Sequence, residues 1–271
     1  MRNDIQTITF ARELFNSDDK NDTYLTGNST SFVSTINRLE IENRENIREI
    51  STYYSCIHSD LWNLSTIAER LTWMQSNALE NQDFKDRWFY YASVDIQIFH
   101  VEIRSILDYI TQIIRLFSPQ PGQVTDTGSF RKLLNWLGNN PNRIQEEVAD
   151  LCLEQYEWFH EMRSIRDFIL HSGGEVIAFG SPDDGILFQV MSPGYENLID
   201  KPFLMFNENV AFFDRYAALY FSRAISFLED LTLLYINQEF PTANIIITEN
   251  HSPGFSTIVD WMNILLNTLA E

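Results

Sequence analysis

From Asn28 to Ser118 the chain contains neither glycine nor proline, although it has 10 glycines and 8 prolines among its 271 residues. Glycine and proline are the residues that most often interrupt helices, and apolar residues recur in this stretch at steps of three and four. We therefore expect a long amphipathic helix over residues 32–78 and a break near 77–86. A second helix over residues 87–117 should then pack antiparallel to the first.

The same spacing predicts which residues of the second helix face the core: Tyr91, Val94, Ile98, Val101, Ile106, Tyr109 and Ile113. Prolines at positions 119 and 121 end that helix. A short helix is expected over residues 130–137, and a longer one over 144–171. Two apolar runs flank Ser181-Pro182-Asp183-Asp184, which is a turn sequence, so a β-hairpin should follow.

The remaining segments complete a fold that is mostly α, an antiparallel helical bundle with a small β-hairpin insertion and additional C-terminal helices. Residues 16–22 are expected to form a polar loop and 203–206 a third short strand, and 208–237 and 258–269 are expected to be helices. The chain divides into a partly looped segment 1–28, a helical core 29–174, a hairpin region 175–206, and C-terminal helices 207–271 that pack on the same domain.

The formal net charge is −19, from 38 acidic and 19 basic residues. A protein that binds duplex DNA by its phosphates needs a basic surface, so any contact with nucleic acid must be confined to a local group of cations. The chain has no run of 18 apolar residues, and its first residues lack the apolar segment of a secretory signal. Cys56 and Cys152 are expected to be reduced core residues. We expect a cytoplasmic protein without membrane or duplex DNA contact.

The last turn of the helix expected over 144–171 brings together an arginine, a carboxylate and a histidine: Arg166, Asp167 and His171. At about 100° per residue, four polar residues share one helix face: His160, Ser164, Asp167 and His171. Arg163 lies one turn before Asp167. Arg166 lies at the edge of the apolar side, where a guanidinium needs a carboxylate or a pocket, and Glu102 and Asp108 are candidate partners.

A purely structural interpretation of this turn stays open. Acidic residues early in a helix and cations late in it are the distribution that the helix dipole favours. Gly173, just beyond the expected end, fits an ordinary C-terminal cap. The residues alone therefore do not decide between a helix end and a reactive site.

The turn Arg166-Asp167-x3-His171 resembles the Arg-x4-His motif of the HEPN superfamily, in which the motif ends the last core helix after a pair of long antiparallel helices. The stretch Glu102-x-Arg104-Ser105-Ile106-Leu107-Asp108 is similar to the polar signature in the preceding long helix of several HEPN-like families. The resemblance covers roughly residues 30–174.

The resemblance implies a metal-independent endoribonuclease of a toxin, defence or stress-response type, which needs no cofactor and works as a homodimer with facing motifs. His171 would transfer the proton, Arg166 would stabilise the charge on the phosphorus, and Asp167 would orient a side chain or the loop. Supporting residues would be Glu102, Arg104, Asp108, Arg163 and His160. The implied partners are single-stranded RNA or a nucleotide, a second copy of the chain, and an antitoxin protein. The alternative is a catalytically inactive HEPN-like module that binds a nucleotide or a protein.

Other chemistries lack a required residue. Glu157-x-x-His160 has the spacing of half a carboxylate-bridged metal pair, but no second Glu-x-x-His exists. His100-x-Glu102 is similar to the start of a zinc deaminase motif, but no Pro-Cys-x-x-Cys follows. Glycine-rich phosphate loops and Gly-x-Ser-x-Gly are absent from the sequence. The aromatic clusters at 88–91 and 158–159 are expected in the core, and no metal site is expected.

Overall fold

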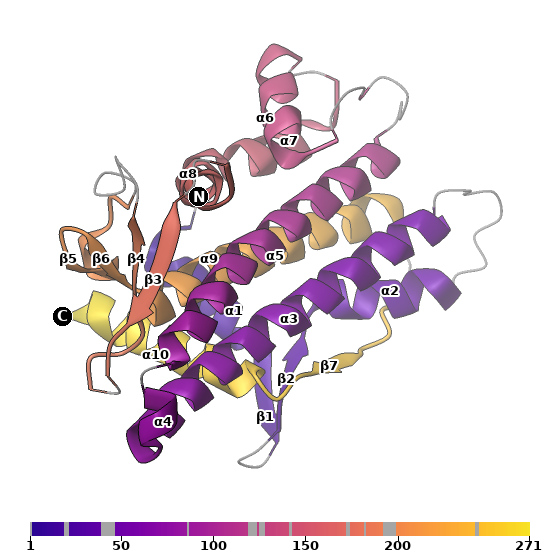
Figure 1. Ribbon diagram of the computed structural model, residues 1–271. Coiled ribbons are helices and arrows are strands. Elements are labelled where there is room, and N and C mark those ends of the chain that lie inside the picture. The colour runs from indigo at the N-terminus through magenta and orange to yellow at the C-terminus, as the bar shows by residue number, and fades with distance from the viewer. Residues whose placement is uncertain are drawn as a thin grey trace.

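The computed structural model of the chain describes residues 2–18, 22–38, 47–85, 87–118, 124, 128–140, 143–171, 174–181, 183–191, 199–241 and 244–271. The fold is mostly helical, with small antiparallel sheets (Figure 1). The helices are α1 (Asp4–Glu13), α2 (Asn28–Arg38), α3 (Ile47–Glu80), α4 (Gln82–Lys85), α5 (Trp88–Phe117), α6 (Phe130–Asn139), α7 (Glu146–Leu153), α8 (Tyr156–His171), α9 (Phe213–Glu239) and α10 (Phe255–Ala270), with a 3-10 turn η3 (Pro202–Leu204).

The strands of the first sheet, in the order β1-β2-β7, are β1 (Phe15–Asp18), β2 (Asp22–Thr26) and β7 (Glu249–His251). Those of the second, in the order β3-β4-β6-β5, are β3 (Glu175–Phe179), β4 (Leu187–Met191), β6 (Val210–Phe212) and β5 (Met205–Asn207). The hairpin β3–β4 confirms the sequence prediction. The third strand, expected over 203–206, instead spans Met205–Asn207, because Pro202–Leu204 form η3. The expectation of a polar loop over 16–22 is wrong for residues 16–18 and 22, which belong to β1 and β2, because β2 pairs with both β1 and β7. Residues 19–21 lie outside the described residues.

The core lies between α3, α5 and α9, with α3 and α5 side by side and α9 behind them in Figure 1. Buried polar contacts join α9 to both of the other helices. The Tyr54 hydroxyl lies 2.8 Å from Thr232 Oγ1, and Nε2 of His100 lies 3.0 Å from the Tyr216 hydroxyl. The C-terminal helices therefore belong to the same core as residues 29–174.

The single helix expected over 32–78 is instead two helices, α2 and α3. The rings of Phe32 and Tyr54 lie 5.2 Å apart, whereas 22 residues of one continuous helix would separate them by about 33 Å. Helix α3 therefore runs back along α2 and does not continue it. Residues 39–46 lie outside the described residues. The break expected near 77–86 is confirmed, since α3 ends at Glu80 and α5 begins at Trp88.

The face of α5 that was expected in the core is partly wrong. Four of its residues face solvent: Tyr91 (55% exposed), Val94 (53%), Ile98 (36%) and Val101 (38%). Helix α5 is apolar on two sides, and steps of three and four fit both of them. The neighbouring elements cover the other side, whose buried residues include Ala92, Ile96, Phe99 and Ile103. Ile106 and Ile113 are buried as expected, and so are Trp88, Trp158 and Phe159. The expectation that the whole cluster 88–91 lies in the core is wrong, because Tyr90 is 66% exposed. Phe89 and Tyr109 are partly buried.

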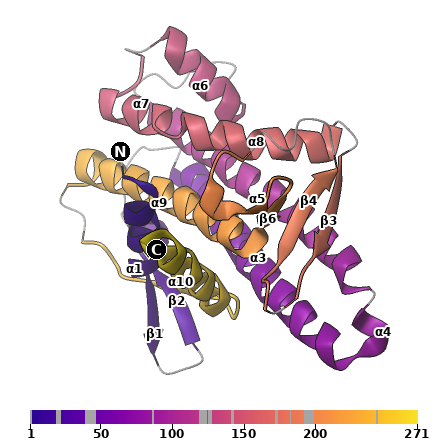
Figure 2. The ribbon, with the colours of Figure 1, turned by 90° about the vertical axis from the view of Figure 1, so that its left-hand side faces the viewer.

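The helix expected over 144–171 is divided into α7 and α8 by a turn at Glu154 and Gln155. At this turn the backbone N–H of Gln155 donates to the Cys152 carbonyl, and the Gln155 side chain contacts the Leu151 carbonyl in its place. Its Nε2 donates to the Leu151 carbonyl over 2.8 Å, while its Oε1 accepts from the Trp158 ring nitrogen over 2.9 Å. Helix α8 then runs across one end of the molecule and leads into β3 (Figure 2).

Candidate functional site

Helices α5, α6 and α8 enclose a pocket of about 520 Å³. Its lining residues are Arg104, Ser129, Arg131, Lys132, Asn135, Arg163, Arg166, Asp167 and His171. The lining holds five arginine or lysine side chains and one carboxylate, on a chain whose net charge is −19. This is the local group of cations that the sequence required for any contact with nucleic acid.

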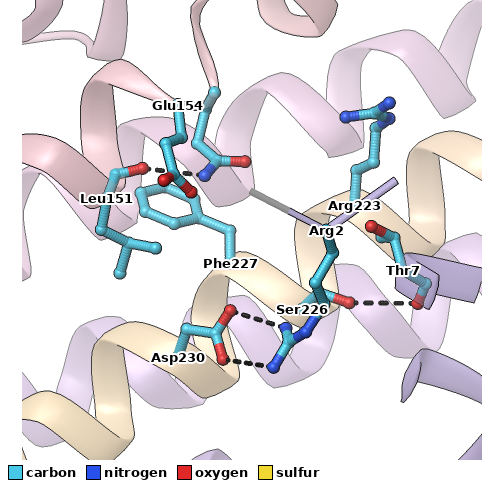
Figure 3. A pocket seen from close by; sticks show the side chains of 9 residues that line it. Arg2, Thr7, Leu151, Glu154, Arg223, Ser226, Phe227 and Asp230 are labelled. Atoms are coloured by element: carbon cyan, nitrogen blue, oxygen red, sulfur yellow. Dashed lines mark hydrogen bonds and ion pairs between the residues drawn. The ribbon is translucent and has the colours of Figure 1, made fainter. Parts of the chain in front are cut away.

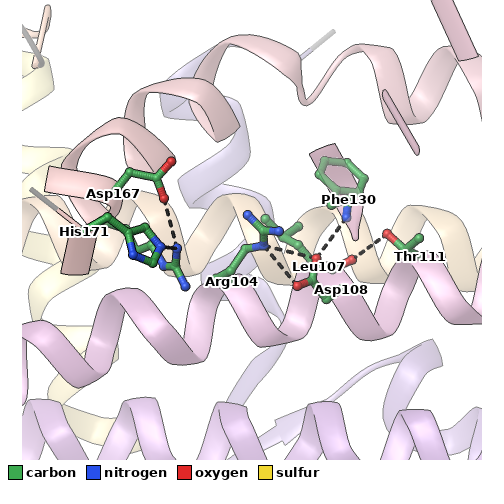
Figure 4. Close-up of polar contacts among 8 residues, drawn as sticks. Arg104, Leu107, Asp108, Thr111, Phe130, Asp167 and His171 are labelled. Atoms are coloured by element: carbon green, nitrogen blue, oxygen red, sulfur yellow. Dashed lines mark hydrogen bonds and ion pairs between the residues drawn. The ribbon is translucent and has the colours of Figure 1, made fainter. Parts of the chain in front are cut away.

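The last turn of α8 forms a connected group of side chains (Figure 4). Nη1 of Arg166 donates to Oδ1 of Asp167 over 2.9 Å and to Nε2 of His171 over 3.0 Å. Nη2 of Arg163 lies 2.8 Å from the other oxygen of Asp167. Because a guanidinium has donors only, Nε2 of His171 is the acceptor in this contact.

The side chains at the end of α8 differ in how far they are exposed to solvent. His171 is exposed, whereas the Arg166 side chain is 23% exposed and its Nε is buried without a hydrogen-bond partner. The N–H of Gly174 donates to the Phe168 carbonyl over 2.9 Å and so closes the helix. Ser172 and Gly173, the residue expected to cap it, lie outside the described residues. Arg166 therefore contacts both Asp167 and His171, and all three predicted catalytic residues line the pocket.

Asp108 was a candidate partner for Arg166, but it contacts Arg104 instead. Nε of Arg104 lies 3.1 Å from each Asp108 oxygen, and Asp108 also accepts the N–H of Phe130 over 2.9 Å (Figure 4). Ser129, which precedes α6, makes no side-chain capping bond. Asp108 of α5 therefore caps α6 from a neighbouring helix and fixes α6 beside the pocket.

Three supporting residues predicted from the sequence do not line the pocket: Asp108, Glu102 and His160. The Glu102 carboxylate accepts from the Asn63 amide over 3.5 Å and lies beside Asp60 of α3. The His160 ring packs 4.3 Å from that of Tyr156. Burial lowers the pKa of His160, and the positive charges of Arg163 and then Arg131 lower it further. Glu102 thus belongs to the α3–α5 boundary.

Sequence reasoning missed Arg131, Lys132 and Asn135 of α6. One signal could have found the two cations. They lie in the first turn of a helix that has no acidic residue there, although the helix dipole favours acidic residues at that end. Helix α7 follows the usual pattern, with Glu146 and Glu147 in its first turn. A basic first turn is unfavourable for the helix alone and therefore points to a binding role.

The other pockets have different chemistry. One of about 240 Å³ contains Arg2, Arg223 and Asp230 (Figure 3). Its arginines are paired with carboxylates, because Arg2 contacts both oxygens of Asp230 at 2.7 and 3.0 Å and Arg223 contacts Asp4. Another, of about 450 Å³, is lined mainly by apolar residues of α3, α4 and α5. Neither combines excess cations with an exposed histidine.

His100, the first residue of the deaminase-like motif considered above, lies in the core. The ring nitrogens of His100 lie 2.7 Å from the Ile96 carbonyl and 3.0 Å from the Tyr216 hydroxyl, so this residue has a structural role in the core. In the described part of the chain, no group of three or more His, Cys, Asp or Glu residues could hold a metal ion. No described helix is long and apolar enough to span a membrane.

Comparisons with known proteins give no assignment, since no family model, no curated protein and no solved structure matches the chain.

Proposed function

We propose that the protein is a HEPN-like, metal-independent endoribonuclease that cleaves single-stranded RNA through Arg166 and His171. One observation carries the proposal: five cationic side chains and an exposed imidazole share one pocket on a chain of net charge −19. Cations bind a phosphodiester and stabilise the charge that develops during its cleavage. A neutral imidazole is the form that accepts a proton.

The proposed reaction is attack of a ribose 2′-oxygen on the adjacent phosphorus. The bond from O2′ to phosphorus forms, the bond to O5′ breaks, and the products are a 2′,3′-cyclic phosphate and a 5′-hydroxyl. Nε2 of His171 accepts the 2′-hydroxyl proton once Arg166 turns its guanidinium from the ring to the phosphate. Arg166 and Arg163 stabilise the phosphorane oxygens, and Asp167 holds both guanidinium groups in place.

Departure of O5′ requires a second proton-transfer group, which a facing copy of the same motif would supply in a homodimer. Support for a second copy comes from the exposed apolar side of α5, which carries Tyr91, Val94, Ile98 and Val101. Contiguous apolar surface of this kind is uncommon on monomers. Light scattering on the purified protein measures the oligomeric state.

The decisive experiment is an RNA cleavage assay in buffer that contains EDTA. His171→Ala and Arg166→Ala are each expected to lower kcat/KM by about 100-fold or more, the usual contribution of a proton-transfer group or of a charge-stabilising donor. His251→Ala and Arg48→Ala remove the same residue types outside the pocket and serve as matched controls. Equal activity of wild type and both pocket variants would rule the proposal out, and duplex DNA should not be cleaved.

A toxin, defence or stress-response role has its own test. Expression of the wild type should arrest growth, and His171→Ala should relieve the arrest. A co-expressed neighbouring protein that restores growth without changing the nuclease sequence would be the antitoxin. Growth arrest that persists with His171→Ala would separate toxicity from cleavage.

A second candidate is a catalytically inactive module that binds a nucleotide. It is favoured by the contact between Arg166 and His171, because this contact occupies the nitrogen that cleavage requires. Binding of single-stranded RNA without cleavage, weakened equally by Arg166→Ala and by Arg163→Ala, would support this alternative.

A further inference from the structure

The cations of the pocket fall into groups on different helices. Arg163 and Arg166 of α8 share the carboxylate of Asp167 and lie next to His171. Arg131 and Lys132 lie on α6, on another wall of the pocket, and both are exposed. Figure 4 shows Arg104 between His171 on one side and Phe130, the first residue of α6, on the other.

The first turn of α6 contains no acidic residue that could neutralise Arg131. Arg131 makes no hydrogen bond or ion pair with the described residues. The nearest carboxylate on α5, Asp108, is already occupied by Arg104 and by the N–H of Phe130. Cationic side chains in the first turn of a helix are repelled by the positive end of its dipole. An anion bound there would be stabilised both by the cations and by the dipole.

The cations of α6 and α8 line the same pocket. Burial is the largest cause of the lowered pKa of His160, and the positive charges of Arg163 and Arg131 lower this pKa further. The electric fields of an α8 arginine and an α6 arginine therefore both reach the His160 ring. The pocket of about 520 Å³ lies within the range of roughly 300–1,000 Å³ for sites that hold whole small molecules. It has the volume of about 17 waters at about 30 Å³ each, which exceeds what one phosphate group fills.

We propose that the pocket contains two phosphate subsites, one for the scissile phosphate at Arg166 and His171 and one for a neighbouring phosphate at Arg131 and Lys132. Arg104 lies between them. This inference rests on the proposed function and specifies its substrate class: an RNA strand with at least two successive phosphates. No lining residue of the pocket is Phe, Tyr or Trp, so recognition follows the backbone and tolerates any base.

The test compares ligands that differ by one phosphate. Uridylyl-uridine and its 5′- and 3′-phosphorylated forms compete with a fluorescein-labelled uridine hexanucleotide for binding to His171→Ala, which removes cleavage. One of the two added phosphates should improve binding by about tenfold or more, as expected for a charge-assisted contact. The double variant Arg131→Ala/Lys132→Ala should reduce this advantage to about twofold or less.

Salt dependence gives an independent readout. The slope of log Kobs against log salt for the hexanucleotide should fall by about 0.7 for each phosphate that the double variant no longer binds. Arg48→Ala/Lys85→Ala makes the same change of charge outside the pocket and should keep both the slope and the tenfold advantage. Arg131→Gln/Lys132→Gln keeps polar, extended side chains, and it replaces the alanine variant if circular dichroism shows that variant to be unfolded.

The possible outcomes distinguish failure of the second phosphate subsite from failure of the proposed nuclease activity. A phosphate advantage that survives in the double variant, or that is absent from the parent protein, overturns the second subsite while leaving cleavage at Arg166 and His171 intact. A phosphate advantage that depends on Arg131 and Lys132 in a protein that never cleaves RNA supports the subsite and overturns the nuclease.

Discussion

Asp167 sets the geometry of the pocket because it is the one carboxylate among the lining residues. It contacts Arg163 one turn earlier and Arg166 next to it, at 2.8 and 2.9 Å. Each contact holds a guanidinium but cancels part of its attraction for a phosphate. Asp167 therefore orients the guanidinium groups of Arg163 and Arg166 but weakens their affinity for phosphate. These two effects can be measured separately.

Asp167→Asn should tighten binding of single-stranded RNA by a few-fold and lower kcat by about tenfold or more. The substitution removes one negative charge from the pocket, which strengthens phosphate binding, but it frees Arg163 and Arg166 from their fixed positions. Fluorescence anisotropy gives Kd, and single-turnover cleavage gives the rate. Asp260→Asn, an exposed change of the same charge on α10, is the control. Parallel decreases in affinity and rate would contradict this assignment.

At the scale of elements, Asp108 connects α5 to α6 by two kinds of contact. It forms an ion pair with Arg104 and accepts the N–H of Phe130. Asparagine keeps an oxygen for the N–H and removes the ion pair, whereas alanine removes both. The pair of variants can therefore separate the charge from the cap.

We expect Asp108→Asn to lower the free energy of unfolding by less than about 1 kcal/mol, because partly exposed ion pairs contribute little. Asp108→Ala should lower it by about 1–2 kcal/mol, because the first N–H of α6 then has no acceptor. Urea unfolding measures both. The affinity that depends on Arg131 and Lys132 should weaken in the alanine variant. Equal destabilisation by the two variants would show that capping is not the main role of Asp108.

The boundary between α3 and α5 carries a pH-dependent element. Asp60 of α3 is 9% exposed. Burial is the main cause that raises its pKa from 3.8 to about 7, and the neighbouring negative charge of Glu102 contributes to the same rise. Between these two pH values the folded chain holds a proton that the unfolded chain has released. Stability from this proton is therefore complete below pH 3.8 and is lost as pH rises through about 7.

Asp60→Asn should flatten the pH dependence of stability between pH 4 and pH 7, because an amide keeps the neutral form at every pH. Burial also raises the pKa of Asp214, to about 6, and that of Glu229, so the wild type should lose further stability in the same direction. Free energies of unfolding at pH 5, 6, 7 and 8 for wild type and variant isolate Asp60 by difference. A difference that does not change with pH would show that Asp60 does not titrate in this range.

At the scale of the whole molecule, local rules predicted the elements well and the tertiary contacts poorly. Helix α5 was expected over 87–117 and spans Trp88–Phe117, because proline and apolar spacing are local signals. The reversal between α2 and α3 was missed, since both helices have the same apolar period. The capping of α2 by Glu229 was also missed, because Glu229 accepts the N–H of Asn28 from 201 residues away.

In the candidate site, too, the residues set by local spacing could be predicted and those set by tertiary contacts could not. Arg166, Asp167 and His171 could be grouped from the sequence because they lie close together on one helix, and the contacts of Arg166 with the other two follow from this spacing. Arg131 and Lys132 were not found, because their position depends on Asp108 reaching α6 from α5. Glu102 was assigned to the site although it faces α3, since its sequence distance from Arg104 says nothing about which neighbour covers it.

Net charge and pocket charge have opposite signs, and salt screens them over different distances. The Debye length is about 30 Å at 0.01 M salt and about 10 Å at 0.1 M. RNA approaching at low salt therefore experiences the whole chain, which carries −19, whereas at higher salt it experiences mainly the five cations around the pocket. We expect the association rate constant for single-stranded RNA to rise between 0.01 and 0.1 M salt, the reverse of the usual trend for nucleic-acid binding.

Stopped-flow fluorescence with labelled RNA measures this rate constant. The dissociation rate constant should also rise with salt, because screening weakens the direct phosphate contacts. Neutralising exposed acids outside the pocket, with Glu13→Gln, Asp260→Asn and Glu271→Gln together, should speed association at 0.01 M and flatten its salt dependence. An association rate constant that falls from 0.01 M upwards in the wild type would mean that the pocket's field dominates at every distance, contrary to the charge balance of the chain.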